Sequence, residues 1–560
     1  MRIVSADWVL PVEGEPVPHG AVAISDDGRI AAVGPAAELG TGDAFPGCVI
    51  LPGFVNCHSH LEYAVYAGFG DGLPFSSWIG LHVARKRLLD LDEMRAIATD
   101  GAHECLRSGI TTVGDCSFAG AAAEAAALTG LRAVAYLEVF GRDAVAIDRF
   151  AELRDRIEPV LSDRVRLGVS PHAPYTCALE LYEECVALGL PLATHLAESE
   201  SERAYLEDGS GNWSVFSEML VPPPGTTGIR MLARAGLLGP RMLAAHCVDV
   251  EPDEIELLAA HGVGVAHCPR SNGILGCGVA PLRDLLDAGL AVGIATDSPA
   301  STPSFDLFEE LRTAVVASRA RERRPDALTA EDALELGTLG GARVLGLDAE
   351  IGSLVPGKWA DITVVSLEGS PLEPVEDPAV AAVLGGRRSG LQLLSLLARS
   401  ATGEARAHGQ IREEPPEERE AACCGSARAP PGADRAVDRG HDVLPAAAAP
   451  REVDVRAARA RLRARIRLLR RRRRRHGSRR HLPRLGRLVG AVGLERPRED
   501  GRPAEGPAGV ARLRDRARDG GEHRRGDRGA RHGDRSRPEG RERVPRAGRP
   551  PSEQGDRAPA

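Results

Sequence analysis

The chain has 560 residues, of which 43% are apolar, and a formal net charge of −8. Such a length and apolar content allow a large hydrophobic core and several domains. Its eleven cysteines include no C-x-x-C pair, no segment approaches the length of a membrane span, and the N-terminus has no signal-peptide pattern. We therefore expect a reduced, cytoplasmic protein and exclude a membrane-spanning or exported one.

The first 50 residues predict a small β layer. Two β-rich runs, RIVSADWVL and GAVAISDDGRIAAVG, occur here, and the second contains the turn sequence Asp26-Asp27-Gly28. That turn between apolar runs is typical of a β-hairpin. We assign residues 1–50 to the N-terminal part of a small β domain.

From about residue 50, apolar strand candidates alternate with helix-like stretches over roughly 300 residues, a size typical of parallel barrels. The expected helices include Leu91–Ser108, Ala178–Leu188, Asp253–Ala260 and Leu282–Ala288. The expected strands are Val49–Asn56, Thr111–Cys116, Leu131–Glu138, Val165–Ser170, Leu190–His195, Met242–His246, Gly262–His267 and Leu290–Thr296. Eight strands are the number that a closed barrel needs, so we predict an α/β protein with a (β/α)8 TIM-like barrel over residues 51–345.

Beyond the barrel, two parts of different character follow. Thr329–Leu345 predicts a helix capped by Thr329, and IGSLVPGKWADITVVS predicts short strands that return to the N-terminal layer. We assign residues 346–386 to the C-terminal part of a composite β-sandwich domain. Residues 387–560 form an Arg-, Ala-, Gly- and Pro-rich tail, which we expect to be disordered because it cannot bury enough apolar surface.

Candidate metal ligands lie at the ends of the apolar runs. His58 and His60 follow one such run, and alternation along a strand points residues i and i+2 to the same side. His195, His246 and Asp297 each close another run, which is where a parallel barrel keeps its chemistry. Together these residue types predict a site for one divalent metal and an activated water.

The lysines bear on the number of metals. The chain contains only Lys86 and Lys358, and neither lies at the end of the fourth predicted strand. A two-metal barrel hydrolase would place a bridging carbamylated lysine there. We therefore expect one metal ion.

Other residues are candidates for proton transfer and substrate contact. Glu198 lies three residues after His195, just past the strand, and a carboxylate beside an activated water is a proton carrier by type. His172 and Trp78 are candidate substrate contacts, with Tyr175 and Trp213 as further aromatic candidates. Gly209–Leu238, which contains Trp213, predicts an insertion at the catalytic face. The pattern leaves His267 open between a cavity group and a structural one, and His82, His103 and His261 are interpreted as structural.

The strings PGFVNCHSHLE, SPHAPYTC, HLAESESE, AHCVDVEPDEIELLAAHGVGVAHCPRSN and GIATDSPAS resemble the amidohydrolase superfamily, in its branch of triazine hydrolases and nucleoside deaminases. The resemblance covers about residues 1–385. It implies a metal held by His58, His60, His195 and Asp297. It further implies that Asp297 accepts a proton from water, that His246 holds the water, and that Glu198 shuttles protons.

Within that branch, HLAES and HCPRSN are most similar to aminodeoxyfutalosine deaminases, with methylthioadenosine/S-adenosylhomocysteine deaminases as the near alternative. The implied function is metal-dependent removal of the 6-amino group of an adenosine-type nucleoside. Another C–N hydrolase of heterocycles is the wider alternative. We expect zinc, with ferrous iron as the alternative, since both suit imidazole and carboxylate ligands. The sequence leaves the exact substrate open, and a homo-oligomer is compatible with it.

The resemblance ends near Gly386. Residues 401–560 hold 41 arginines, no lysine and 24 acidic residues, a balance of +17 against −25 for residues 1–400. A reading-frame shift in GC-rich coding sequence would produce such a composition. The alternative is a genuine RNA- or DNA-binding arm, since clustered arginines neutralise phosphates. We do not expect nucleic-acid binding, because no aromatic residue interleaves the arginines to stack on bases.

Overall fold

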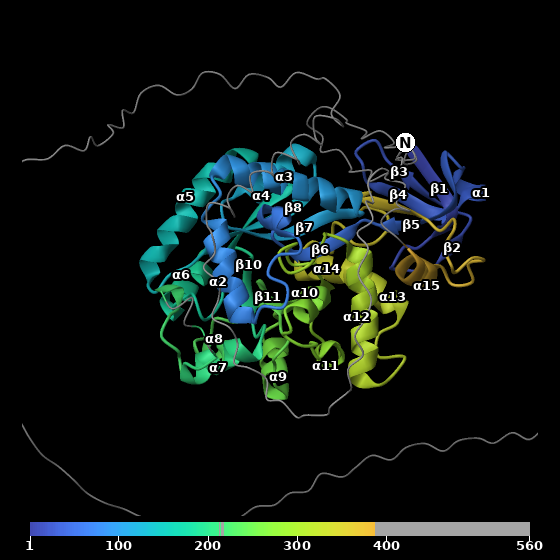
Figure 1. The fold of residues 1–560 in the computed structure, drawn as a ribbon. Coiled ribbons are helices and arrows are strands. Elements are labelled where there is room, and N and C mark those ends of the chain that lie inside the picture. The colour runs from blue at the N-terminus through green and yellow to red at the C-terminus, as the bar shows by residue number, and fades with distance from the viewer. Residues whose placement is uncertain (212, 214–217, 387–560) are drawn as a thin grey trace, which may run out of the picture. The chain divides into compact units, whose positions relative to one another are not determined.

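The structure is a computed structural model of the chain, and it describes residues 1–211, 213 and 218–386. These residues form a sheet of eight parallel strands surrounded by helices and a separate six-stranded sheet (Figure 1). The tail expected over residues 387–560 lies outside the described residues, so its disorder stays a prediction. Among the described residues, none of the helices has the length and apolar character that crossing a bilayer requires.

The parallel strands confirm the predicted barrel. In sheet order they are β6 (Phe54–Ser59), β7 (Ile110–Ser117), β8 (Arg132–Val139), β9 (Val165–Pro171), β10 (Leu192–Leu196), β11 (Met242–His246), β12 (Gly264–His267) and β13 (Val292–Ile294). The last strand meets the first through a parallel bridge between Ser59 and Asp297. The Asp297 N–H donates to His58 O at 3.1 Å, so the closure itself fixes one candidate ligand beside another.

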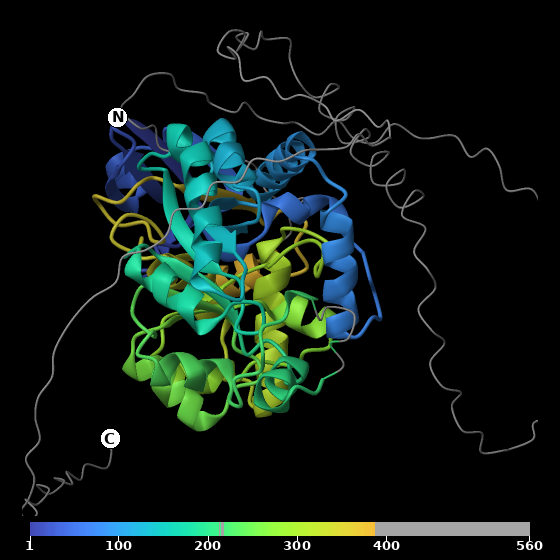
Figure 2. The ribbon, with the colours of Figure 1, turned by 90° about the vertical axis from the view of Figure 1, so that its left-hand side faces the viewer.

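In both views of the molecule, helices lie around the outside of the parallel strands (Figures 1 and 2). The predicted helices are confirmed within one or two residues, and the first of them begins with a capping box between Asp90 and Glu93. In the described residues the α-helices are α1 (Ala36–Leu39), α2 (Phe75–Lys86), α3 (Leu91–Arg107), α4 (Ala121–Thr129), α5 (Asp148–Ile157), α6 (Leu179–Ala187), α7 (Glu200–Asp208), α8 (Gly228–Arg234), α9 (Pro252–Ala260), α10 (Pro269–Ile274), α11 (Leu282–Asp287), α12 (Leu307–Glu322), α13 (Ala330–Glu335), α14 (Gly341–Val344) and α15 (Pro378–Val380).

One predicted strand is wrong in its extent. Val49–Asn56 was expected as a single barrel strand, but β5 (Asp43–Pro52) belongs to the smaller sheet and β6 begins only after Gly53. A Cβ at Gly53 would lie 2.1 Å from Thr111 Oγ1, so only glycine allows the backbone to approach this closely. The chain therefore changes sheets at a position that side-chain pattern alone does not mark.

The smaller sheet joins the two terminal segments, as predicted. Its order is β14-β5-β1-β3-β4, with β2 paired to β1; the new strands are β1 (Arg2–Val9), β2 (Val17–Pro18), β3 (Gly20–Ile24), β4 (Ile30–Pro35) and β14 (Ile362–Ser366). The expected hairpin is β3–β4, whose turn uses Gly28 at φ 85°. In the described residues these strands form one hydrogen-bonded sheet, which is the small β domain predicted beside the barrel.

The barrel interior is apolar at the end where the strands begin. Val55, Val134 and Tyr136 belong to one buried cluster there, together with Ala342 and Leu345 from the segment after α13. That segment packs closely because glycines face the strands: a Cβ at Gly341 would lie 2.6 Å from Val55 O. This end of the barrel is thus filled by protein, which leaves the opposite end for ligands.

Candidate metal and substrate site

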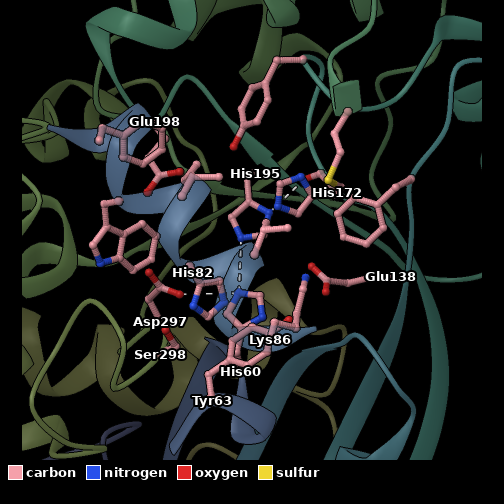
Figure 3. Close-up of a pocket in the computed structure, with 17 residues that line it drawn as sticks. His60, Tyr63, His82, Lys86, Glu138, His172, His195, Glu198, Asp297 and Ser298 are labelled. Atoms are coloured by element: carbon pink, nitrogen blue, oxygen red, sulfur yellow. Dashed lines mark hydrogen bonds and ion pairs between the residues drawn. The ribbon is translucent and has the colours of Figure 1, made fainter. Parts of the chain in front are cut away.

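Four imidazoles and one carboxylate converge where the barrel strands end. His58 lies near the end of β6, His60 directly after it, His195 in β10, His246 at the end of β11, and Asp297 just after β13. His60 Nε2 is 3.3 Å from His195 Nε2, and Asp297 Oδ1 lies 3.7 Å from His58 Nε2 and 3.5 Å from His60 Nε2. Figure 3 shows His60, His195 and Asp297 facing the same pocket. The structure thus brings together all the residues that the sequence singled out as ligands.

Backbone carbonyls orient two of these rings. His60 Nδ1 donates to Cys116 O at 2.8 Å, and His195 Nδ1 donates to His172 O at 2.9 Å. A ring that donates from Nδ1 in its neutral form carries its lone pair on Nε2. Both rings therefore present an unprotonated Nε2 to the centre of the site, which is the form that binds a metal.

Side chains orient the other groups. His246 Nδ1 donates to Asn272 Oδ1 at 2.9 Å, which leaves His246 Nε2 facing the site. Asp297 Oδ2 accepts from Ser271 Oγ at 2.7 Å and Ser301 Oγ at 2.8 Å. The other carboxylate oxygen, Oδ1, remains directed at the imidazoles. These contacts fix each group before any ligand arrives.

The donor set fits a divalent metal. Nε2 of His58 and Nε2 of His246 are buried without a hydrogen-bond partner in the described residues, a costly state for a polar atom. Burial lowers the pKa of His60 to about 4 and that of His195 to about 3, so both imidazoles are neutral near pH 7. Neutral imidazoles around a carboxylate are the ligands that zinc and ferrous iron take.

Three residues at the site have left-handed backbone conformations. Ala197 has φ 52°, His246 φ 78° and Asp297 φ 57°, values that residues other than glycine rarely adopt. The Ala197 carbonyl accepts from the N–H groups of Val248 and Asp249, so the β10 and β11 turns hold each other. Such conformations persist where the surrounding structure imposes them, and they are concentrated at functional sites.

Glu198 faces the same centre from the loop after β10. Its Oε1 lies 3.6 Å from His246 Nε2, and the side chain is buried. Burial, with Asp297 and Glu202 nearby, raises the pKa of Glu198 well above its usual range. Glu202 accepts from the backbone N–H groups of Ala197 at 3.0 Å and of Glu198 at 2.7 Å, which fixes the turn that carries Glu198. The geometry thus places a carboxyl group of raised pKa beside the imidazole of His246.

A pocket of about 590 Å³ of empty space, partly open to solvent, lies over this centre (Figure 3). Its wall is largely aromatic and includes three of the candidate substrate contacts, Trp78, Tyr175 and His172. Trp213 packs behind Tyr175 at a centroid distance of 4.8 Å, and its Nε1 donates to Ser201 O. The rest of the predicted insertion is described except for residues 212 and 214–217.

Three pocket residues were missed or interpreted differently from sequence. His82, which the sequence predicts to be structural, lines the pocket and stacks on Trp78 with ring planes 3° apart. Lys86 and Glu138 also line it. A signal existed: Trp78, His82 and Lys86 are spaced four apart, which puts them on one face of α2. Glu138 is two residues past Tyr136 in β8, and alternation points both into the barrel.

The remaining histidines differ in their surroundings. His267, left open from sequence, is buried, and neither of its ring nitrogens has a hydrogen-bond partner in the described residues. His261 Nδ1 donates to Leu257 O at 2.8 Å within the end of α9, which fits its structural interpretation.

Several known proteins are similar to this chain. A model of the amidohydrolase family matches residues 49–389. The 5-methylthioadenosine/S-adenosylhomocysteine deaminase of Syntrophobacter fumaroxidans is 35% identical over 405 residues, which are 68% of this chain and 88% of that protein. The 5'-deoxyadenosine deaminase of Methanothermobacter thermautotrophicus is 34% identical, over 64% of this chain and 84% of that protein.

Solved structures share the fold. An adenosine deaminase from Xanthomonas campestris with bound zinc is 29% identical with a TM-score of 0.63, and the match covers 70% of this chain and 90% of that one. The aminofutalosine deaminase of Helicobacter pylori is 21% identical with a TM-score of 0.61, over 69% and 97% of the two chains. At that identity the second likeness concerns the fold alone.

Proposed function

The chain belongs to the amidohydrolase family, and from this premise we propose that it hydrolyses the 6-amino group of an adenosine-type nucleoside with the help of one divalent metal. The observation that carries the proposal is the convergence of four imidazoles, Asp297 and Glu198 at one end of the barrel. The relatives with 29%, 34% and 35% sequence identity support a nucleoside as the substrate, since each is named as a nucleoside deaminase.

We assign His58, His60, His195 and Asp297 as the residues that would hold the metal. Donor atoms of His58, His60 and Asp297 lie within 4.8 Å of one another, and His195 Nε2 lies 3.3 Å from His60 Nε2. The unpartnered Nε2 of His58 supports a ligand that is part of the functional protein. A divalent metal supplies Lewis acidity, which makes water a nucleophile at neutral pH. Zinc is the proposed ion, because the donor set suits it and the similar Xanthomonas structure contains it.

The protein groups move the protons. Replacement of an amino group by water forms a C–O bond and releases ammonia, so the water must lose a proton and the leaving nitrogen must gain one. Asp297 accepts the proton from water at Oδ1, and His246 Nε2 orients the water oxygen. Glu198 donates its proton to the ring nitrogen beside the reacting carbon, the proton that Asp297 took from water leaves with ammonia, and the remaining hydroxyl proton returns to Glu198 as the carbonyl forms. The raised pKa of Glu198 supports its role as the acid.

The substrate is proposed as a 6-aminopurine nucleoside with a modified 5' position. Methylthioadenosine and 5'-deoxyadenosine have the stronger support, from relatives at 35% and 34% identity. Aminodeoxyfutalosine, favoured from the sequence motifs, stays in the proposal. The aromatic wall of the pocket supports a flat ring, since such pockets bind bases by stacking.

Ammonia release by the purified full chain tests the proposal. The panel is methylthioadenosine, 5'-deoxyadenosine, aminodeoxyfutalosine, adenosine, adenine, cytosine and a triazine. We expect the 5'-modified nucleosides to be fastest and free adenine to be poorest, because binding energy from the remote group is used to position the ring. Cytosine or a triazine as the fastest substrate would overturn the nucleoside assignment and leave a metal-dependent hydrolase.

A further inference from the structure

Two oppositely charged side chains in the pocket wall have no part in the proposed proton transfers. Lys86, at the end of α2, is 6% exposed, and Glu138, near the end of β8, is 1% exposed. Both line the pocket. Figure 3 shows the Lys86 ammonium directed toward Glu138, and Glu198 lies on the far side of His195 from the pair.

Aromatic rings surround the Lys86 ammonium, but they do not give its N–H groups good hydrogen-bond acceptors. Its Nζ lies 4.0 Å from the ring centroid of Phe118, 5.2 Å from that of Phe140 and 5.6 Å from that of Tyr63. Ring faces attract a cation, yet they accept hydrogen bonds poorly. Among the described residues Lys86 has no ion pair within 4.0 Å. The ammonium therefore keeps N–H groups that need an acceptor.

Glu138 presents the complementary deficit. Its Oε2 is buried without a hydrogen-bond partner in the described residues, and its carboxylate lies within 4.8 Å of ring nitrogens of His172 and His195. The neighbouring carboxylate of Glu62 differs, because it accepts from Ser117 Oγ and two backbone N–H groups. Glu62 is thus a satisfied structural acid, whereas Glu138 needs a donor from the pocket.

The opposite charges of Lys86 and Glu138 limit the kinds of ligand that can bind beside both of them. An isolated anion bound to Lys86 would also lie near Glu138, and an isolated cation bound to Glu138 would lie near Lys86, so either would be repelled by one member of the pair. A hydroxyl group both donates and accepts. Two adjacent hydroxyls can donate to Glu138 and accept from Lys86 while they add no charge.

We propose that Lys86 and Glu138 form a hydroxyl-binding subsite that receives the vicinal 2'- and 3'-hydroxyls of the substrate's sugar. This inference rests on the proposed deamination of nucleosides and names the part of the substrate that makes the site select a nucleoside over a free base. The subsite lies beside His172 and His195, so a sugar held there keeps the attached base next to the metal ligands.

The test compares two substrates of the full-length enzyme, adenosine and 2',3'-dideoxyadenosine. These nucleosides differ only in the 2'- and 3'-hydroxyls. The variants are Glu138→Gln and Lys86→Met, with Glu62→Gln as the matched buried carboxylate outside the pocket wall. We expect kcat/KM of the wild type to favour adenosine by at least about 100-fold, and the preference to fall below about 10-fold in both pocket variants. Rates on dideoxyadenosine should change little. Because each ratio is internal to one variant, Glu62→Gln should keep the wild-type preference even where it lowers stability.

The outcomes separate the two proposals. Equal rates for adenosine and dideoxyadenosine in the wild type would refute the subsite and leave nucleoside deamination standing. Equal losses on both substrates in Glu138→Gln and Lys86→Met would also refute it, since a merely structural pair cannot discriminate the sugars. If Glu138→Gln fails to fold, Lys86→Met gives the same comparison. Absence of deamination of any nucleoside by the wild type would overturn the proposed function itself.

Discussion

The two ends of the barrel are formed by the same eight strands but differ in the kinds of residue that they contain. At the end where the strands begin, Val55 and Tyr136 pack on Ala342 and Leu345, and glycines such as Gly341 let backbones approach closely. At the other end titratable residues lie among aromatic ones, the backbone is left-handed at Ala197, His246 and Asp297, and buried polar atoms such as His58 Nε2 have no hydrogen-bond partner in the described residues.

The two ends therefore contribute differently to the stability of the protein and to ligand binding. The closed end contributes stability through the packing of apolar side chains. At the open end, left-handed turns and buried polar atoms without partners destabilise the protein until a metal and a substrate bind. The packing of the rest of the protein offsets that cost. Substitutions at the two ends should therefore separate stability from chemistry.

The largest expected effect is at the open end. Glu198→Gln keeps the shape of the side chain but removes its proton, so turnover should fall roughly 10²–10⁴-fold, the usual contribution of a general acid or base. Metal content and melting temperature should match the wild type. Steady-state ammonia release measures the effect, with the exposed Glu200→Gln two residues along as the control. Activity within a few-fold of the wild type would make Glu198 an ordinary buried acid.

A packing change at the closed end should do the reverse. Gly341→Ala places a Cβ 2.6 Å from Val55 O, and overpacking of this kind costs roughly 1–3 kcal/mol of unfolding free energy. The specific activity of the folded fraction should remain close to that of the wild type. Denaturant unfolding measures the loss, and Gly239→Ala, with no atom within 4 Å of its Cβ, is the control. A selective loss of turnover without loss of stability would contradict the division between the ends.

The smallest effect is expected from the Arg-rich tail. Both ends of the barrel and all the site residues lie within the described residues up to Gly386. Removal of residues 401–560 should leave turnover, metal content and melting temperature nearly unchanged, and should abolish any salt-sensitive binding of nucleic acid. Unfolding of the truncated chain would show that the barrel needs the tail.

The sequence predicted the barrel and the clustering of the candidate ligands, because each candidate lies at or near the end of an apolar run, a pattern that needs no tertiary information. It did not predict the break at Gly53, since the close approach to Thr111 that requires glycine comes from a strand more than 50 residues away. It also missed Lys86 and Glu138. A lysine at the end of a helix is usually solvated, and only the packing of Phe118, Phe140 and Tyr63 buries this one.

A metal titration of the purified full chain, read together with ammonia release from methylthioadenosine, tests the proposed metal-dependent deamination most directly. We predict one equivalent of divalent metal per chain, loss of turnover on chelation and recovery with Zn²⁺, while His60→Ala neither retains the full equivalent nor recovers. Two equivalents in the wild type would contradict the single-metal site. Turnover that survives complete removal of the metal, or normal metal content and activity in His60→Ala, would contradict the assignment of the open end as a metal-dependent active site.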